Sequence, residues 1–598
     1  MKLLAALLFL TAQQQLNQTI VVTASELPET IESTPAAVTV ITRKQIDERT
    51  ARDVADVLRE VPGLTLERTG SPGKATSLFA RGSASTQTLV LWNGIEINNP
   101  YFSGYDWGRF STASIEQIEV VRGPFSALYG SEAMAGVINV LTTPRASHLR
   151  AEVQSGSHGL RNGAVDGAWV GGSLLLSGAA EHRQDDGFSP NDDFHQNTAS
   201  VLAKWSPLAA FSIGVEARRT SYDLGIPFNT NADATRLVPS LQRRQDGTES
   251  QVAMPLTFKG IDLTLSEGKR RDNFRDPEDP FTTFTRTDSR SRRARLTMRS
   301  GVTLAGTIVG GGEYERQTVT DTTNFGPNFA DRRRTDRALF VEDRYAHAFG
   351  RSRLELSAGI RNDRFSTFGS QTSPRLAAAW IANGRKFRLA YGEGFRAPSL
   401  GELYYPFFGN ANLKAERNRS FEAGYDAPIA TNGLLSLTYF SSHYHDLITF
   451  DPTTFVSENI GRVRTDGLEL GLQQPLTTSL YAAVSYTYLH RAEDEATGLR
   501  LQRRPKHSGS LSLGWRAGNT DTNVVVLRTG ARPDSEATFP FARATNRAYT
   551  LIDANVQVRI GTFTPFVKVE NLADSRYEEV RGFASPRRRA IVGLRFAM

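Results

Sequence analysis

Carboxylate and imidazole side chains offer the first candidates for chemistry. The densest acidic group lies in one polar segment and comprises Asp185, Asp186, Asp192 and Asp193. Hard oxygen ligands of this kind suit calcium, although an ordinary solvated loop has the same composition. His443 and His445 would share one face of a strand, which permits metal binding.

Catalytic and nucleotide sites are not indicated. Serine and histidine residues stand in no recognisable nucleophile and base constellation, so we predict that the protein is not an enzyme and requires no cofactor. The segments Gly310–Gly312 and Ser71–Lys74 lack the Walker spacing of a phosphate-binding loop. Energy for any mechanical work must therefore come from outside the chain.

Composition narrows the class of protein. The 598 residues suggest two domains or one very large one. After the first dozen residues no apolar run could cross a bilayer as a helix, whereas membrane strands hide their apolarity in alternation. The net charge of +7 is dispersed along the chain, unlike the basic footprint of a nucleic-acid binder.

The first residues resemble an export signal. Lys2 precedes the apolar run Leu3–Leu10, and Thr11–Ala12 would form a small-residue cleavage site. We expect residues 1–12 to be a signal peptide; a buried first helix is the alternative. Residues 13–32 are polar and are expected to form a flexible arm.

Residues 33–145 have the pattern of a small α+β domain. Thr42 and Gln45 have capping-box spacing, and Thr50 could cap a second helix. Asn93-Gly94 between apolar alternations predicts a hairpin.

From residue 146 to 598, apolar and polar residues alternate with period two. One clear run places Leu354, Leu356 and Ile360 on one face. Tight turns alternate with polar stretches such as 270–290 and 317–337, which we expect to be long loops. At roughly 20 residues per strand and connection, the sequence predicts a transmembrane all-β barrel of about 22 antiparallel strands. A soluble propeller or sandwich is the rival, but no blade-length repeat is present.

Ordered motifs resemble the TonB-dependent outer-membrane receptor family, and the cobalamin receptors in particular. In the first domain they are Val61-Pro62-Gly63-Leu64, Ala80-Arg81-Gly82, Glu119 to Pro124, Ala127 to Ser131 and Gly136 to Asn139. In the second they are Phe395 to Pro398, Glu402 to Tyr404, Asn412 to Glu416, Gly467 to Glu469 and Val569 to Leu572 with Tyr577. Asn93, Ala415 and Ala573 depart from the family pattern.

The resemblance implies that residues 33–145 plug the lumen of the barrel. It also implies a TonB box at Thr19, Ile20, Val21, Val22, Thr23 and Ala24. A short extended box can pair edge to edge with a sheet of TonB, which would transmit the proton gradient of the inner membrane. Family analogy further places Arg81 and Arg122 of the plug opposite Glu416 and Glu469 of the barrel, and it suggests structural calcium at the four aspartates.

An imported ligand would first meet loops at the apex of the plug. The two candidate loops contribute Thr69, Gly70, Ser71, Asn98, Asn99, Tyr101 and Phe102. Aromatic side chains give a large contact area, although Tyr101 and Phe102 could instead pack the plug against the wall. The short arm and modest barrel length resemble those of the cobalamin receptors, and this resemblance implies cobalamin as the substrate. Arginine-rich loops such as Arg332-Arg333-Arg334 would suit a ferric siderophore, while a passive porin or an adhesin is the remote alternative.

Overall fold

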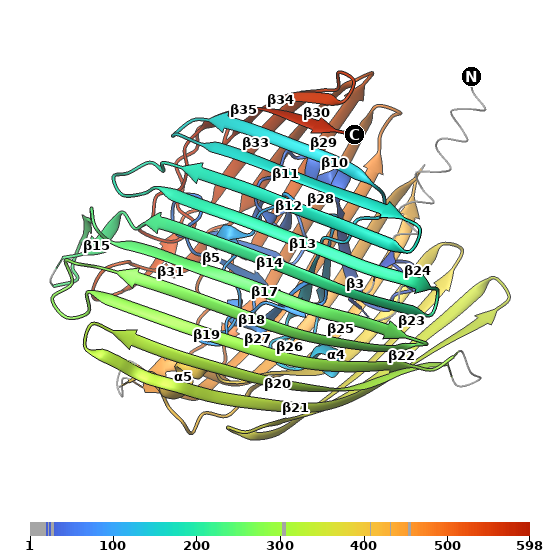
Figure 1. The fold of residues 1–598 in the computed structure, drawn as a ribbon, viewed down its shortest axis with the longest axis horizontal. Helices are drawn as coiled ribbons and strands as arrows, with labels where there is room; N and C mark the ends of the chain where they lie inside the picture. Colours follow the sequence, from blue (N-terminus) through green and yellow to red (C-terminus); the bar gives the residue numbers. More distant parts are fainter. Residues whose placement is uncertain are drawn as a thin grey trace.

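The computed structural model describes residues 20–21, 23–24, 29–231, 233–301, 306–406, 408–430, 432–451 and 456–598 (Figure 1). The expected signal peptide and much of the expected arm, including Thr19 and Val22 of the expected TonB box, lie outside these residues. No helix in the described ranges has the length and apolarity needed to cross a membrane.

Twenty-two antiparallel strands form a closed barrel in chain order, and β35 pairs with β10 to complete it. This confirms the predicted fold class and strand number. The barrel strands are β10 (His148–Gly156), β11 (Arg161–Gly171), β12 (Leu174–Asp185), β13 (Phe194–Leu208), β14 (Phe211–Gly225), β17 (Arg244–Phe258), β18 (Ile261–Arg275), β19 (Phe284–Arg299), β20 (Thr307–Thr323), β21 (Gly326–Phe349), β22 (Ser352–Phe365), β23 (Gly369–Ala382), β24 (Arg385–Arg396), β25 (Glu416–Ile429), β26 (Gly433–Asp451), β27 (Val456–Pro475), β28 (Leu480–Asp494), β29 (His507–Ala517), β30 (Thr520–Thr529), β33 (Tyr549–Val558), β34 (Phe563–Glu570) and β35 (Arg589–Ala597).

The connections distinguish the two ends of the barrel. Most turns at one end are short, and those at the other include long loops that hold α5 (Leu400–Tyr404) and two hairpins. The hairpins are β15 (Phe228–Thr230) with β16 (Leu237–Pro239) and β31 (Arg532–Ser535) with β32 (Arg543–Asn546). In Figure 1 the long-loop end is on the left. In outer-membrane barrels the long loops are extracellular, so this end faces outward.

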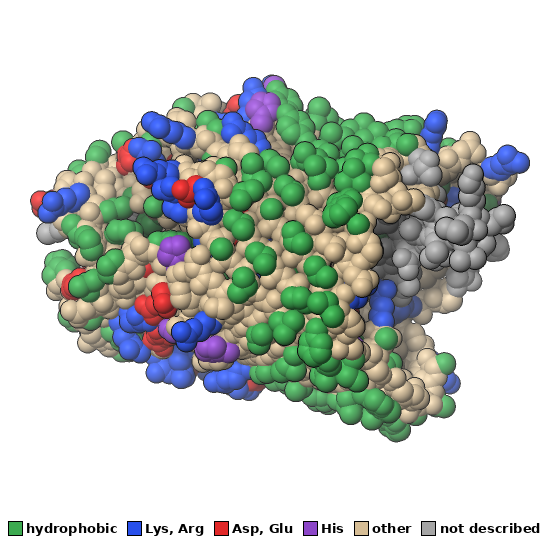
Figure 2. Space-filling view, turned by 90° about the horizontal axis from the view of Figure 1, so that it is seen from above, with side chains coloured by type: hydrophobic (Ala, Val, Ile, Leu, Met, Phe, Trp, Pro, Cys, Tyr) green, Lys and Arg blue, Asp and Glu red, His purple; other side chains and the backbone are tan. Residues whose placement is uncertain are grey.

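Strand alternation gives each wall segment a lumen face and a lipid face. In β20, Glu313, Glu315 and Gln317 are buried toward the plug, whereas Ile308 and Tyr314 are about two-fifths exposed on the outside. Figure 2 shows the resulting band of hydrophobic side chains on the outer wall, with Lys and Arg side chains gathered toward the outward end.

The expected long loops at 270–290 and 317–337 are largely strand. β18 continues to Arg275 and β19 begins at Phe284, while β20 and β21 are joined by a tight turn at 324–325. The polar composition of these stretches has a different cause: the strands extend beyond the apolar band, so both of their faces are polar. Strand length in this part of the barrel is thus underestimated by a rule based on alternation alone.

Inside the barrel lies a domain built on a five-stranded sheet of order β3-β8-β9-β6-β7. Its strands are β3 (Ala37–Thr42), β8 (Gln117–Arg122), β9 (Gly136–Leu141), β6 (Thr88–Trp92) and β7 (Ile95–Glu96). A hairpin of β4 (Leu64–Arg68) and β5 (Thr76–Ala80), the helices α2 (Arg43–Glu48), α3 (Val54–Leu58) and α4 (Ser126–Tyr129), and the short 3-10 turns η1 (Ser85–Gln87) and η2 (Trp107–Arg109) complete it. We call this domain the plug.

Local chemistry explains the start of two plug helices and the turn between β6 and β7. The capping box of Thr42 and Gln45 starts α2 as expected. Asn93 and Gly94 both have positive φ, 50° and 82°, as a tight primed turn between β6 and β7 requires. The expected cap at Thr50 is wrong, because Asp53 precedes α3 and forms the capping box with Asp56.

Candidate functional site

A chamber of about 710 Å³ lies at the outward end, where the plug meets the barrel loops. The plug contributes Thr69, Gly70, Ser71, Lys74 and Ala75 from the β4–β5 connection. Aromatic side chains from the barrel and its loops are Phe188, Phe228, Tyr549, Tyr577 and Phe583. The first expected ligand loop therefore forms part of a real cavity, and its other walls come from loops that the sequence did not single out.

Two plug side chains fasten the chamber floor to the barrel. The Lys74 ammonium donates to the main-chain carbonyls of Asp192 (3.0 Å) and Gly225 (2.7 Å). The Ser71 hydroxyl donates to the Asp192 carboxylate. Burial lowers the pKa of Lys74, and the nearby Asp192 carboxylate offsets this only in part. A ligand in the chamber would thus touch the plug and a barrel loop that are already linked.

Within the described residues, no three of the four aspartates suggested for calcium bring their ligand atoms within 4.8 Å of one another. Asp185 pairs with Arg589, and Asp193 pairs with Arg244 at 2.8 Å, while Asp192 binds Ser71 and Lys74. Among the described residues, the one group whose ligand atoms lie within 4.8 Å of one another is Glu116, His148 and Asp166. Arg150 donates to both carboxylates of that group. Its guanidinium therefore already supplies the positive charge that a metal ion would bring.

The second expected ligand loop lies outside the chamber, and three of its four candidate side chains have partners within the protein. Asn98 donates to Glu132 and accepts from the Val90 amide, and Asn99 accepts from the Tyr101 amide. Tyr101 is buried against a cluster of Phe329, Val319 and Leu400 on the barrel wall and α5. Phe102 is 63 % exposed and packs edge-on to Tyr101. None of these four residues lines the chamber.

Below the chamber, Arg81 ties the plug to the wall. Its guanidinium donates to both Glu469 oxygens, at 2.7 and 3.0 Å, and to Glu422 at 2.7 Å. Burial lowers the pKa of Arg81, but these two carboxylates outweigh that effect and raise it above its usual value. Arg81 also adopts a positive φ of 53°, an unusual backbone conformation that places its side chain in this cage.

Arg122 is the weaker partner in the same network. Its Nε lies 3.5 Å from Glu469, and its Nη1 donates to the Pro62 carbonyl at 2.8 Å. Burial lowers the pKa of Arg122, with only partial compensation by Glu469. Gly63 is required beside them, because a Cβ there would stand 2.1 Å from a Glu469 oxygen and its φ is +83°. The close approach of Glu469 therefore explains why the Val61-Pro62-Gly63-Leu64 motif has glycine at position 63.

Replacing Glu469 by Gln should loosen the plug locally. Removing one partner of a buried ion pair costs about 3–5 kcal/mol, and Glu422 would retain part of the interaction with Arg81. We expect backbone amides around Gly63 and Arg81 to exchange hydrogen for deuterium at least tenfold faster, equivalent to about 1.4 kcal/mol.

Glu393→Gln provides the matched control, because Glu393 pairs with the largely exposed Arg419 at 3.3 Å on the outer wall. Such pairs contribute about 0–1 kcal/mol. Identical exchange in the Glu469 variant and the unmodified protein would remove Glu469 from the plug anchor.

Glu416 faces the plug but forms no ion pair with an arginine in the described part of the plug. It pairs with Arg396 of the barrel at 2.8 Å and accepts from Gln87 of the plug at 2.8 Å. Arg396 also pairs with Glu402 of α5, which explains why the Phe395–Pro398 and Glu402 motifs occur together. The expected pairing of Glu416 with a plug arginine is therefore replaced by a glutamine contact.

Further plug–barrel ion pairs were not predicted. They include Arg52–Glu570 (2.9 Å), Arg59–Glu579 (2.7 Å), Arg183–Asp53 (2.6 Å), Arg293–Glu96 (2.5 Å) and Arg532–Glu67 (2.8 Å). Their barrel members sit on lumen faces or in outward loops. The period-two pattern could have marked the strand members as inward-facing, but it cannot name their partners.

The described part of the arm lies at the short-turn end. β1 (Ile20–Val21) pairs with β2 (Glu29–Thr30), and Glu29 contacts Arg344 of β21. Thr23 donates from its amide (2.9 Å) and its hydroxyl (2.5 Å) to Glu119 of the plug sheet. The end of the expected TonB box is thus held against the plug, on the side opposite the chamber.

A barrel closed by an internal plug, with an outward chamber and an arm at the opposite end, defines a plugged outer-membrane receptor. Family models agree: residues 145–572 match the β-barrel of TonB-dependent receptors and residues 30–137 match the TonB-dependent receptor plug domain. The chain therefore belongs to the TonB-dependent receptor family, whose members are transporters and receptors of the outer membrane.

Individual relatives differ in what they bind. The chain is 27 % identical over 570 residues to the vitamin B12 transporter BtuB of Photobacterium profundum, covering 91 % of this chain and 89 % of the relative. Similar solved structures include the siderophore receptor PirA of Acinetobacter baumannii (TM-score 0.80, 16 % identity, 97 % and 100 % of the two chains) and the ferric enterobactin receptor PfeA of Pseudomonas aeruginosa (0.79, 18 %, 97 % and 100 %). At these identities the structures show the shared fold alone.

Proposed function

We propose that this protein imports cobalamin through the outward chamber, driven by TonB acting on the arm. The observation that carries this proposal is the chamber itself, which combines plug and loop residues in one cavity. Its volume is within the range of about 300–1,000 Å³ typical of small-molecule sites. The cobalamin assignment is supported by the relatedness to BtuB over most of both chains.

Coupling would begin at the arm. TonB is proposed to pair with the backbone of residues 19–24 by strand addition. Among the described residues, β1 pairs with β2 alone, and Thr23 is held by Glu119 and Asn139 of the plug. A pull on the box would therefore act first on these plug strands. Residues 1–12 are proposed as the signal that directs export.

A ferric siderophore is the second candidate, and the charge of the chamber favours it. Arg581 and Arg587 at the cavity pair with Glu536 and Asp574. Arg547 and Arg576 also line the cavity and form no ion pair with a carboxylate in the described ranges. Free guanidinium groups would suit an anionic chelate. Binding of cyanocobalamin and of ferric enterobactin to the purified protein, compared by calorimetry, separates the two candidates.

Phe228→Ala combined with Phe583→Ala should weaken ligand binding at the chamber. These aromatic side chains come from two different loops, and loss of anchors worth more than about 1.4 kcal/mol lowers affinity at least tenfold. Phe281→Ala with Phe325→Ala is the control, since those residues are 74 % and 78 % exposed and lie outside the chamber. Tyr101→Ala with Phe102→Ala should likewise leave affinity unchanged. If only the Tyr101 and Phe102 variant lost affinity, the ligand would bind at the second plug loop and not in the chamber.

A further inference from the structure

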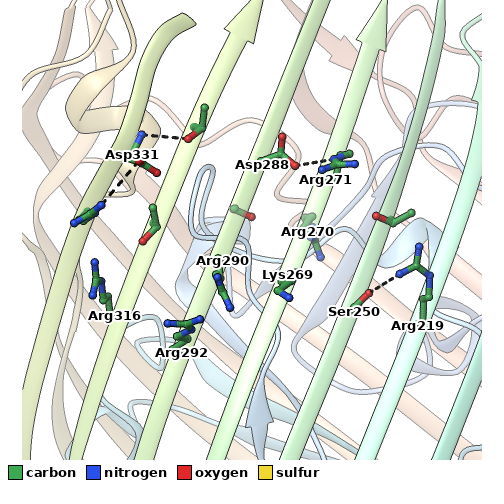
Figure 3. Close-up of a pocket in the computed structure, with 15 residues that line it drawn as sticks. Arg219, Ser250, Lys269, Arg270, Arg271, Asp288, Arg290, Arg292, Arg316 and Asp331 are labelled. Atoms are coloured by element: carbon green, nitrogen blue, oxygen red, sulfur yellow. Dashed lines mark hydrogen bonds and ion pairs between the residues drawn. The ribbon is translucent and has the colours of Figure 1, made fainter.

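A basic depression lies on the outer wall of the barrel, away from the chamber. It has a volume of about 550 Å³ and spans strands β14 and β17 to β21 (Figure 3). Six of its cations, which we call the basic wall patch, are Lys269, Arg271, Arg290, Arg292, Arg316 and Arg333. Nothing in transport through the lumen uses these side chains, because they point to the opposite side of the wall.

The orientation of the patch follows from strand alternation. On β18, Lys269 and Arg271 share the face of Leu265, which is 45 % exposed in the apolar band. On β19, Arg290 and Arg292 share the face of the exposed Met298. Lys269 is four residues beyond Leu265, or about 13 Å at roughly 3.3 Å per residue. The patch therefore begins where the lipid-facing band ends, on the outward side.

The strand register places like charges opposite one another. Lys269 is the direct partner of Arg290, and Arg292 is the direct partner of Arg316. Like charges in directly opposed positions destabilise a sheet. The barrel nevertheless gathers them here, which indicates that an anion offsets the repulsion.

The carboxylates present are too few to provide that compensation. Glu267 is shared by Lys269 (2.9 Å), Arg290 (2.6 Å) and Arg292 (2.8 Å). Asp288 and Asp331 lie near Arg271 and Arg333. Six cations and three carboxylates leave a net charge of +3, and Arg316 has no ion-pair partner among the described residues.

We propose that the basic wall patch binds the phosphate groups of an anionic lipid in the outer leaflet. Guanidinium groups form directional, charge-assisted hydrogen bonds with phosphate. The acyl chains of such a lipid would lie on the adjoining apolar residues, including Leu265, Met298 and Tyr314. Contact with both parts of the molecule favours a phosphorylated lipid over a soluble phosphate, which could use only the cations.

Native mass spectrometry of the intact, detergent-purified protein with diphosphoryl lipid A tests this site. Arg316→Gln breaks no ion pair of the described structure, and we expect about fivefold weaker binding, as for one cation worth about 1 kcal/mol at a lipid surface. A variant with all four cations at positions 269, 290, 292 and 316 replaced by Gln should bind lipid A at least tenfold more weakly. The matched control changes four exposed wall arginines outside the patch to Gln: Arg364, Arg417, Arg419 and Arg528.

Comparing lipid A with and without its phosphates, and adding inorganic phosphate as a competitor, identifies which part of the lipid is bound. Lipid A without phosphates should bind at least tenfold more weakly than the diphosphoryl form, and excess inorganic phosphate should not displace the bound lipid. The proposal is overturned if the patch variants bind lipid A as tightly as the unmodified protein does. It is also overturned if the control variant loses as much affinity for lipid A as the patch variants do. It is equally overturned if inorganic phosphate displaces the lipid completely, since the patch would then be a simple anion site.

Discussion

Cells that carry the Val21→Pro variant should bind cobalamin at their surface but accumulate none above background. Proline removes a backbone donor and fixes φ, so it disrupts the strand that TonB is proposed to extend. The chamber lies at the other end of the plug and should keep its affinity within about twofold. Radiolabelled cyanocobalamin, measured as surface-bound and internal fractions, reads out both quantities.

Two control variants make this result specific. Val21→Thr keeps the backbone donor and the β-branched shape, so uptake should persist. Thr30→Pro damages the β1–β2 pairing without changing the box. If Thr30→Pro abolishes uptake as Val21→Pro does, the effect belongs to the β1–β2 hairpin and the TonB-box assignment fails.

Deleting residues 33–143 should convert the protein into an open, unselective pore. A barrel of 22 strands encloses a lumen wide enough for water and solutes, and the plug fills it here. Removal also breaks the Arg81, Arg52 and Arg59 ion pairs, but their barrel carboxylates would then face water and tolerate the loss. Single-channel recording in planar bilayers should show conductance at least ~tenfold above that of the intact protein.

A correctly inserted barrel is the condition for interpreting that recording, and the full chain in the same bilayer is the reference. The Glu469→Gln variant, with the plug loosened but present, should remain near the conductance of the intact protein. A plug-deleted barrel that conducts no better than the full chain would mean that the domain inside the lumen is not what closes it.

The fold could be predicted because alternation is a local property. Each strand of the wall must show lipid on one face and the plug on the other, so residues such as Leu354 and Leu356 reveal their orientation without any partner. Strand length was harder to predict, since β18 and β19 continue as polar ladders beyond the apolar band. There the surroundings of both faces are polar and the signal of period two disappears.

Side-chain partners at the site could be predicted only where a motif fixed them. Arg81 and Arg122 were expected opposite Glu416 and Glu469 as a set, but the contact of Arg81 with Glu422 was not expected, because it depends on the register of strands more than 340 residues away. For the same reason the sequence could not show that Gln87 meets Glu416 or that Asp192 binds Ser71. Tyr101 has the residue type of a ligand contact, yet its position beside α5 buries it.

Accumulation of cobalamin against its concentration gradient is the decisive measurement for TonB-driven import. The unmodified protein would be expressed in cells that lack their own cobalamin receptor, and radiolabelled cyanocobalamin would be followed with and without TonB and with and without a protonophore. We expect internal cobalamin well above the external concentration only when both TonB and the proton gradient are present. Uptake that proceeds equally after either is removed, or that only reaches the external concentration, would contradict active import and indicate a passive pore.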